Sequence, residues 1–304
     1  MKLLEAYDSF MLYKQSYCSD TTVIDYAQTL NIFFKWLDKK DIDVSELTDD
    51  LIMRYCAFVT QNARSPATAI TYKRDFKCFL KYIESELNQN LPCKISRIKV
   101  RKPPRREVKP LSDNDVKALF EAASSPIAWI QARNKAIISF GLDSGLREKE
   151  IVSIKLSRLD KDNRTIHVIG KGSKERTIPI GQFTLQLLLD YICKCPYHIE
   201  DNVFLSQHGQ PLTENAVKVF MNRLKHKTKL DICCHKLRHN FTTESLIRSY
   251  NTKGVMNTEV LQYMLGHNDI RTTQQYVHIA FEQIIAKNFD SRLDSVYAVK
   301  KISN

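Results

Sequence analysis

The sequence predicts a mostly α-helical protein of two domains that includes a small β-sheet, an α+β fold. Apolar residues recur three and four positions apart through most of the chain, which is typical of amphipathic helices. Two short segments rich in β-branched residues flank a turn near the middle, and a basic, proline-containing segment separates two regions. At 304 residues the chain is long enough for each domain to bury its own core.

The first region, residues 1–92, is expected to form a bundle of four short amphipathic helices. The third helix is expected to start at Ser45 or Thr48, both of which can cap a helix N-terminus. The fourth is expected to start at Ser65, with Pro66 at the first helical position, where its missing N–H costs nothing. The apolar stripes predict the core, so a function of this bundle would lie on its polar faces.

The next segment, residues 93–110, is expected to be an extended linker between the domains. Eight of the sixteen residues from 94 to 109 are basic, and Pro103-Pro104 blocks a helix. The whole chain has 46 Lys and Arg against 34 Asp and Glu, a net charge of +12. This excess favours a polyanionic partner, because each neutralised phosphate releases condensed counterions. On charge alone, a soluble basic protein without such a partner is an equal alternative.

The basic segment suits a strap along a DNA backbone, although a solvated surface is the ordinary alternative for a charge run. Further basic side chains lie on the fourth expected helix and in the expected turn of the sheet. The candidates for contact with double-stranded DNA are Lys73, Arg74, Lys77, Arg101, Lys102, Arg105, Arg106 and Lys174.

The second region, residues 111–304, is expected to be helical around a small sheet. Ser112 and Asp115 resemble a helix N-terminal cap. The expected strands are 164–169 and 176–180, and the glycine-containing turn between them is typical of a hairpin. Helices are expected over 113–123 and 127–143, and from about 182, 213, 235, 258 and 271, with a last one from about 280.

Composition argues against several classes of protein. No apolar run approaches the ~20 residues that span a bilayer, and the N-terminus lacks a secretion signal, so a cytoplasmic protein without a membrane contact is expected. Cytosolic redox conditions argue against disulfides among the eight cysteines. The two Cys/His clusters, at 193–198 and 233–235, lack the paired CxxC spacing of a zinc site, so neither a metal nor another cofactor is expected.

Four local patterns of the second region contain residues suited to chemistry. They are Gly145-Leu146-Arg147, Gly170-Lys171-Gly172, His235-Lys236-Leu237-Arg238, and Leu265-Gly266-His267 with Tyr276 nine residues later. Each alone has an ordinary explanation, such as a helix start, a hairpin tip or a structural pair on one helix face.

Together and in this order, the patterns resemble the tyrosine recombinase (phage integrase) family, particularly its Xer-like members. The resemblance covers nearly the whole chain and implies a helical core-binding domain, a basic linker and a catalytic domain. The family's catalytic residues fall on Arg147, Lys171, His235, Arg238, His267 and Tyr276. The run Gly141–Ser144 and Asn240 differ from the residues that are usual in the family. These positions are neighbours of the catalytic residues and are not catalytic themselves.

The resemblance implies that DNA is cut and rejoined through a covalent 3′-phosphotyrosyl bond. Two arginines can hold the non-bridging phosphate oxygens as charge develops on them. A histidine, whose ordinary pKa is near neutrality, suits a base for the Tyr276 hydroxyl at position 235, and the resemblance assigns Lys171 as the acid for the departing 5′-oxygen. The covalent bond keeps the energy of the cleaved linkage, so neither ATP nor metal is needed. Glu150 is expected either to orient the arginines or to be a surface carboxylate, and His239 to support the site.

Other classes share parts of the pattern. A non-catalytic DNA-binding architectural protein would be expected to lack a catalytic residue, and none of the six is missing. A metal-dependent nuclease would need a carboxylate cluster for Mg²⁺, which the acidic residues near 143–162 do not form. A related type IB topoisomerase-like enzyme uses the same chemistry, but the compact two-domain layout favours a recombinase.

The chain after Tyr276 bears on assembly. Its apolar stripe at helical spacing consists of Phe281, Ile284, Ile285, Phe289 and Leu293. In the family the corresponding tail docks on a neighbouring subunit, which implies a homotetramer on DNA built from free monomers or dimers. Packing of the stripe on its own domain is the alternative. The sequence leaves open whether the enzyme integrates a mobile element, resolves chromosome dimers or inverts a segment.

Overall fold

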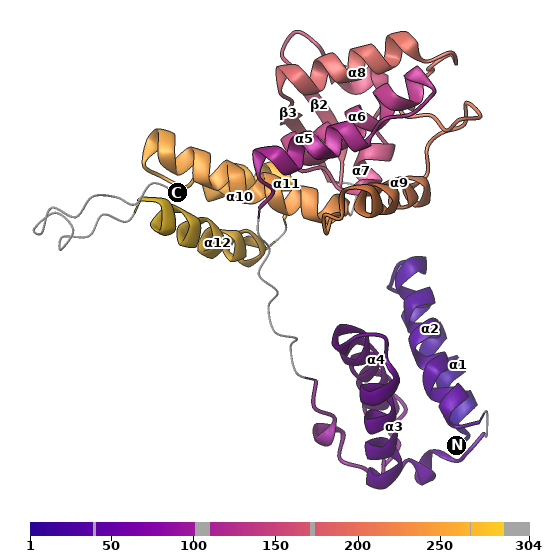
Figure 1. Ribbon diagram of the computed structural model, residues 1–304. Helices are drawn as coiled ribbons and strands as arrows, with labels where there is room; N and C mark the ends of the chain where they lie inside the picture. Colours follow the sequence, from indigo (N-terminus) through magenta and orange to yellow (C-terminus); the bar gives the residue numbers. More distant parts are fainter. Residues whose placement is uncertain (39–40, 101–109, 171–173, 268, 289–304) are drawn as a thin grey trace, which may run out of the picture. The chain divides into compact units, whose positions relative to one another are not determined.

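The structure is a computed structural model that describes residues 1–38, 41–100, 110–170, 174–267 and 269–288, the last three by their backbone only. The chain divides into two compact units, Met1–Glu107 and Val108–Asn304 (Figure 1). The predicted class is confirmed, since helices dominate both units and one small sheet lies in the second.

The first unit is a helical bundle around an aromatic core. Its helices are α1 (Leu3–Gln15), α2 (Asp20–Trp36), α3 (Asp49–Asn62) and α4 (Pro66–Ser85). The Thr48 hydroxyl accepts a hydrogen bond from the Leu51 N–H, and the Ser65 hydroxyl accepts one from the Thr68 N–H, so both predicted caps form. The buried core includes Phe10, Phe33, Tyr55, Phe76 and Phe79, whose rings meet mostly edge to face.

The start of the expected linker belongs to this bundle, which corrects the prediction of an extended segment from residue 93. Cys93, Ile95 and Ile98 are buried in the core of the first unit, and a short 3-10 turn spans Ile95–Arg97. Burial of these three apolar side chains stabilises the segment on the bundle, although the surrounding residues are basic. Residues 101–109 lie outside the described part of the chain.

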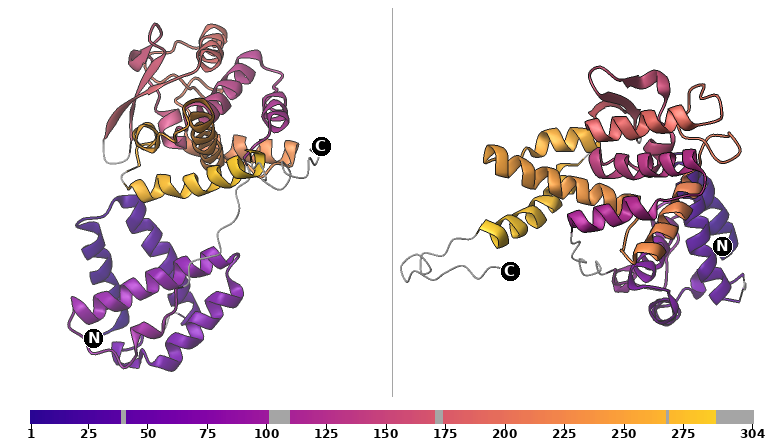
Figure 2. Two further views of the ribbon diagram at one scale, coloured as in Figure 1. Left: turned by 90° about the vertical axis from the view of Figure 1, so that its left-hand side faces the viewer. Right: turned by 45° about the horizontal axis from the view of Figure 1, so that its top comes forward.

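In the second unit, helices pack on one face of a three-stranded antiparallel sheet (Figure 2). The Ser112–Asp115 capping box forms as predicted. A two-residue strand that the sequence did not reveal lies at one edge. The elements are α5 (Asp113–Ala122), α6 (Ala128–Asp143), α7 (Glu148–Val152), β1 (Leu159–Asp160), β2 (Thr165–Ile169), β3 (Glu175–Pro179), α8 (Gln182–Lys194), α9 (Glu214–Thr228), α10 (Cys234–Lys253), α11 (Thr258–Leu265) and α12 (Ile270–Asn288).

Two hydrophobic clusters hold this unit together. The larger joins α6, α8 and α9 to the inner face of the sheet, where Ile166 pairs with Ile178. The smaller joins α10, α11 and α12, and includes Phe241, Leu265 and Tyr276. Because the smaller cluster contains Tyr276 itself, the packing of these three helices determines where that side chain lies.

The helix that carries Tyr276 continues without a break, so the prediction of a separate helix from residue 280 is wrong. No glycine or proline interrupts Ile270–Asn288, and nothing else in this stretch favours a helix end. Ile284 is buried in the smaller cluster, whereas Phe281 and Ile285 are 42% and 58% exposed. Phe289 and Leu293 lie outside the described residues.

Candidate active site

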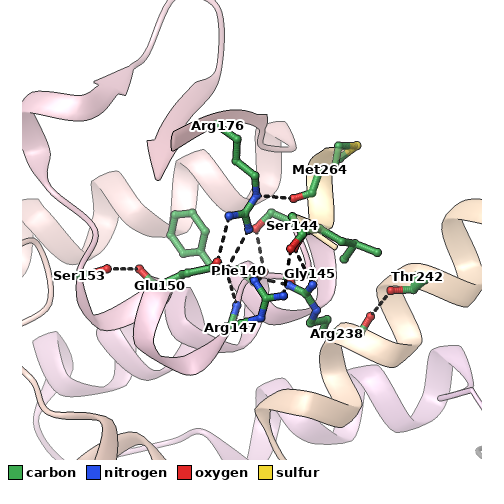
Figure 3. Close-up of polar contacts among 12 residues, drawn as sticks. Phe140, Ser144, Gly145, Arg147, Glu150, Ser153, Arg176, Arg238, Thr242 and Met264 are labelled. Carbon is green, nitrogen blue, oxygen red and sulfur yellow. Dashed lines mark hydrogen bonds and ion pairs between the residues drawn. The ribbon is translucent and has the colours of Figure 1, made fainter. Parts of the chain in front are cut away.

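Three arginines from three elements surround one buried carboxylate (Figure 3). Arg147 precedes α7, Arg176 lies on β3 and Arg238 on α10. The Glu150 side chain is 3% exposed and accepts hydrogen bonds from Arg147 Nη1 at 3.0 Å and from Arg176 Nη1 and Nη2 at 2.9 and 3.0 Å. Arg238 Nη1 lies 3.9 Å from the same carboxylate.

Glu150 orients this group, and the expectation that it is a surface carboxylate is wrong. Burial by itself raises the pKa of Glu150. The hydrogen bonds from Arg176 and from the Arg147 backbone N–H, together with the charges of both arginines, outweigh burial and lower the pKa below its ordinary value. The carboxylate is therefore ionised, and it fixes one Nη nitrogen of Arg147.

The other hydrogen bonds of the two predicted arginines go to backbone carbonyls. Arg238 donates from Nη1 to the Gly145 carbonyl at 2.8 Å and from Nη2 to the Leu265 carbonyl at 2.6 Å. Arg147 donates from Nη2 to the Gly266 carbonyl at 3.2 Å. Gly145 and Gly266 adopt left-handed conformations, with φ of 59° and 63°; Gly145 directly follows the C-cap of α6, and Gly266 is the C-cap of α11.

Arg238 is 2% exposed yet stays charged at neutral pH. Burial and then the charge of Arg147 lower the pKa of Arg238 to about 10, while Glu150 acts in the opposite sense. The side chain of Arg147 is 37% exposed, so it presents the more accessible guanidinium face.

The aromatic part of the site places Tyr276 among histidines. Its ring centroid lies 4.9 Å from that of His239 and 6.4 Å from that of His267, whose plane is nearly parallel. The rings of His239 and His235 lie 4.2 Å apart on α10. His267 Nδ1 lies 2.9 Å from the hydroxyl oxygen of buried Thr273. Tyr276 is 5% exposed, and its hydroxyl makes no hydrogen bond with the part of the chain that the structure describes.

The protonation states suit a phosphate site. Burial raises the pKa of Tyr276, although the charges of Arg238 and Arg147 act against this rise. Burial and nearby positive charge lower the pKa of His239 and of His267 to about 4. His235 as a whole residue is exposed, yet partial desolvation of its ring and the two arginines lower its pKa too. All three histidines are therefore neutral at pH 7.

Five of the six predicted catalytic residues meet in this region. Arg147 and Arg238 share Glu150 and the carbonyls at the end of α11, and Tyr276 lies beside His267 and, through His239, near His235. Lys171 lies outside the described residues. Its hairpin closes with a 2.7 Å hydrogen bond from the Gly170 N–H to the Lys174 carbonyl.

The sequence reasoning missed Arg176, whose side chain is 6% exposed. The signal was strand alternation, because Arg176 shares an inward face with Ile178 and Ile180. An arginine on the buried face of a strand needs a carboxylate partner, and Glu150 is that partner.

The predicted DNA contacts are described in part. On α4, Lys73 donates to the Thr60 hydroxyl, Arg74 pairs with Asp75, and Lys77 donates to the Ile98 carbonyl. Lys174 is exposed just before β3. Arg101, Lys102, Arg105 and Arg106 lie outside the described residues.

Three further findings concern the residues that the structure describes. Within these ranges no three His, Cys, Asp or Glu side chains gather as metal ligands. No helix among them is long and apolar enough to cross a membrane. All eight cysteines are free thiols.

Comparison with known proteins gives consistent matches. The family model described as "Phage integrase family" matches residues 109–283 of this chain. A tyrosine recombinase XerD from Pseudomonas putida is 29% identical over 90% of this chain and 92% of the relative. A tyrosine recombinase XerC from Leptospira interrogans is 29% identical over 88% of this chain and 85% of the relative.

Solved structures share the fold. A lambda integrase dimer bound to a COC′ core site has a TM-score of 0.72 at 16% identity, over 91% of this chain and 95% of that one. A XerH recombinase bound to its difH substrate has a TM-score of 0.68 at 20% identity, over 92% and 80%. Since the family match spans more than half of the sequence, this chain belongs to the phage integrase family and is a Xer-like tyrosine recombinase.

Proposed function

We propose that this protein is a site-specific DNA recombinase that cuts and rejoins double-stranded DNA through a covalent bond between Tyr276 and a 3′-phosphate, without metal or ATP. One observation carries the proposal: two fixed, charged arginines lie beside a buried tyrosine that neutral histidines flank. The names of the relatives and the DNA in the structures with the same fold support it.

The arginine pair would hold the scissile phosphate. A guanidinium has five N–H donors, and the hydrogen bonds described here use two in each of Arg147 and Arg238. Three donors on each remain for the non-bridging oxygens, on which negative charge grows during attack. Because the donors are already in place, they stabilise the transition state without reorganisation.

Proton transfer would involve Tyr276, His235 and Lys171. Ionising an unperturbed phenol at pH 7 costs about 4 kcal/mol, and burial adds to this cost. His235 is neutral and would take the proton; its ring lies 4.2 Å from that of His239, which lies 4.9 Å from the tyrosine ring. The Tyr276 oxygen then bonds to phosphorus as the bond to the 5′-oxygen breaks, and Lys171 protonates that oxygen. A 5′-hydroxyl of a partner strand reverses these steps.

His267 would supply a further hydrogen bond to the phosphate. If the Thr273 hydroxyl donates to Nδ1, the proton of the neutral ring stays on Nε2, which can then donate to a phosphate oxygen. Thr273 thereby selects the useful tautomer.

Covalent trapping tests the assignment. On a duplex nicked near the cleavage site, the short 5′-hydroxyl strand diffuses away, so the wild-type protein should accumulate a protein–DNA adduct that survives denaturant and forms in EDTA. Tyr276→Phe should bind DNA with little change and form no adduct, whereas Tyr263→Phe, at a 58% exposed position on α11, should behave as wild type. An adduct in Tyr276→Phe, or its loss in EDTA, contradicts the mechanism.

DNA binding would use both units and the basic segment between them. We assign residues 1–98, with Cys93–Ile98 packed on the bundle, as the core-binding domain, the following residues up to 110 as the linker, and 111–304 as the catalytic domain. Converting Arg101, Lys102, Arg105 and Arg106 to Gln should weaken binding to all sequences. The salt slope should fall by up to about one per lost phosphate contact. An unchanged slope would show that this segment does not contact phosphates.

Assembly would follow the family pattern of a homotetramer on DNA. Ile284 is buried in its own domain, so only the chain beyond it is available for a neighbour, together with exposed Phe281 and Ile285. Deleting residues 289–304 should leave single-site binding intact and abolish the four-subunit synaptic complex. A truncated protein that still forms this complex contradicts the tail assignment. Recombination would take place in the cytoplasm, and the DNA sites determine whether it integrates a mobile element, resolves or inverts.

A further inference from the structure

We propose that Arg176 is a positioning residue that holds the arginine pair in register with the phosphate through Glu150 and the end of α11. The inference rests on the proposed function of that pair. It assigns to the second strand of the hairpin a role in the placement of the phosphate-binding groups.

The guanidinium of Arg176 joins three elements. Its two Nη atoms donate to the two oxygens of Glu150 at 2.9 and 3.0 Å, and its Nε donates to the Met264 carbonyl at 2.8 Å (Figure 3). This planar fork therefore fixes the rotation of the Glu150 carboxyl and ties it to the last turn of α11. A lysine at this position has one nitrogen and cannot make all three bonds with the same geometry.

The carboxylate that Arg176 fixes is the one that holds Arg147. Glu150 Oε1 accepts from both Arg147 Nη1 and Arg176 Nη1, and Oε2 accepts from the Arg147 backbone N–H and from Arg176 Nη2. If the carboxyl rotates, the side chain and the backbone N–H of Arg147 both lose their partner. Arg176 thus acts on the reacting phosphate only through another residue.

The end of α11 adds a second connection. Three consecutive carbonyls accept hydrogen bonds from three different arginines: Met264 from Arg176, Leu265 from Arg238 and Gly266 from Arg147. A displacement of this turn moves all three guanidinium groups together. His267 follows it directly in the chain, so the turn also bears on the histidine beside Tyr276.

Glycines let the guanidinium lie against the backbone on both sides. A Cβ at Gly170 would lie 2.9 Å from Arg176 Nη1, and one at Gly266 would lie 3.0 Å from the same atom. Gly170 directly precedes the turn of the hairpin and Gly266 ends α11. A shift of β3 by one residue would turn Arg176 to the outer face, so the strand register and the arginine pair depend on each other.

The test uses Arg176→Lys, which keeps the charge and loses the fork. Its matched control is Arg164→Lys, at an exposed arginine that directly precedes β2. Three nicked duplexes are compared: normal DNA, DNA with a neutral methylphosphonate at the scissile position, and DNA with sulfur in place of the bridging 5′-oxygen. The neutral linkage develops less negative charge, so its reaction depends less on stabilisation by the arginine pair. A sulfur leaving group does not need to be protonated.

On normal DNA, Arg176→Lys should form the adduct about 100-fold more slowly, as for a small misplacement of catalytic groups, with DNA affinity within about threefold of wild type. The deficit should shrink to less than about tenfold on the methylphosphonate and persist on the sulfur substrate. An equal deficit on all three substrates, or rescue by sulfur alone, overturns the proposal. Because each preparation meets all three substrates, partial misfolding cancels in the ratios.

Further measurements distinguish a failure of the Arg176 proposal from a failure of the proposed recombinase function. Adduct formation by wild type and Arg164→Lys tests the proposed function alone. Without any cleavage, the side-chain ¹⁵N resonances of Arg147 should shift in Arg176→Lys and not in Arg164→Lys, and unshifted resonances overturn the proposal. Adding Glu150→Gln to Arg176→Lys should cost less than the sum of the two single losses, because both changes remove the Arg176–Glu150 contact, and fully additive losses also overturn the proposal.

Discussion

The two halves of the candidate site are held in different ways. Arg147 and Arg238 are fixed by hydrogen bonds to Glu150 and to backbone carbonyls, at distances of 2.6 to 3.2 Å. Tyr276 has ring contacts with His239 and His267 and packs into the cluster of α10, α11 and α12. Directional bonds preset the phosphate-binding half, while shape and packing alone place the nucleophile, whose hydroxyl stays available for the reaction.

The largest effect should come from the directional half. Arg238→Lys should slow adduct formation by about 10²–10³-fold, because a lysine cannot donate to the Gly145 and Leu265 carbonyls and to phosphate together. Arg248→Lys, at an exposed position on the same helix, is the control and should react as wild type. If both variants cleave nicked DNA at the wild-type rate, the comparison between the halves is wrong.

A smaller effect is expected where one hydrogen bond reaches the tyrosine half. Thr273→Val keeps the shape of a fully buried side chain and removes the partner of His267 Nδ1. Adduct formation should slow roughly tenfold, and unfolding should cost about 1 kcal/mol less, the usual worth of one hydrogen bond. Thr272→Val, at an exposed position, should change neither rate nor stability. If Thr273→Val slowed the reaction as much as Arg238→Lys, the proposed difference between the two halves of the site would be wrong.

Packing around the nucleophile should affect stability more than rate. Ile284→Ala removes buried surface from the cluster that contains Tyr276 and should lower the free energy of unfolding by about 2–5 kcal/mol. The rate of adduct formation per folded molecule should fall only a few-fold. Ile285→Ala, at a 58% exposed neighbour, should stay within about 0.5 kcal/mol of wild type in urea unfolding. Equal effects of the two changes would contradict the packing of this helix on its own domain.

The mildest perturbation is acid. Burial lowers the pKa of His239 and His267 to about 4, so the unfolded chain binds more protons between about pH 6.5 and 4. Stability should therefore be full above pH 6.5 and decrease as the pH falls toward 4. In urea titrations, the double variant His239→Gln, His267→Gln should show a flatter dependence. A steep decrease in that variant would assign the acid effect to other groups.

The sequence predicted most of the helices because their apolar periodicity and caps are local signals. The capping residues Thr48, Ser65 and Ser112 all act as expected. The errors arose where tertiary contacts decide the structure. Basic residues around Cys93–Ile98 concealed three core side chains, and the apolar pattern was divided into two helices at a point where no glycine or proline interrupts α12.

The same distinction applies to the site. The resemblance to the family, which rests on the order and spacing of the four motifs, identified Arg147, Arg238 and Tyr276, which the structure brings together with His235 and His267. Arg176 was missed because its role depends on a partner 26 residues earlier in the chain. Sequence spacing carries no record of such a pairing, although the alternation of β3 shows that the side chain points inward.

The two glycine turns that accept the arginine hydrogen bonds set limits on directed evolution of this enzyme. A methyl group at Gly145 would lie 2.4 Å from the Phe241 ring, so libraries that vary this position should yield few active clones. Gly254 also has a left-handed conformation but has nothing within 4 Å of its missing Cβ. Asn adopts that conformation more readily than other non-glycine residues, so Gly254→Asn should be better tolerated than any change at Gly145. Selection for new DNA sites should therefore leave Gly145 and Gly266 untouched.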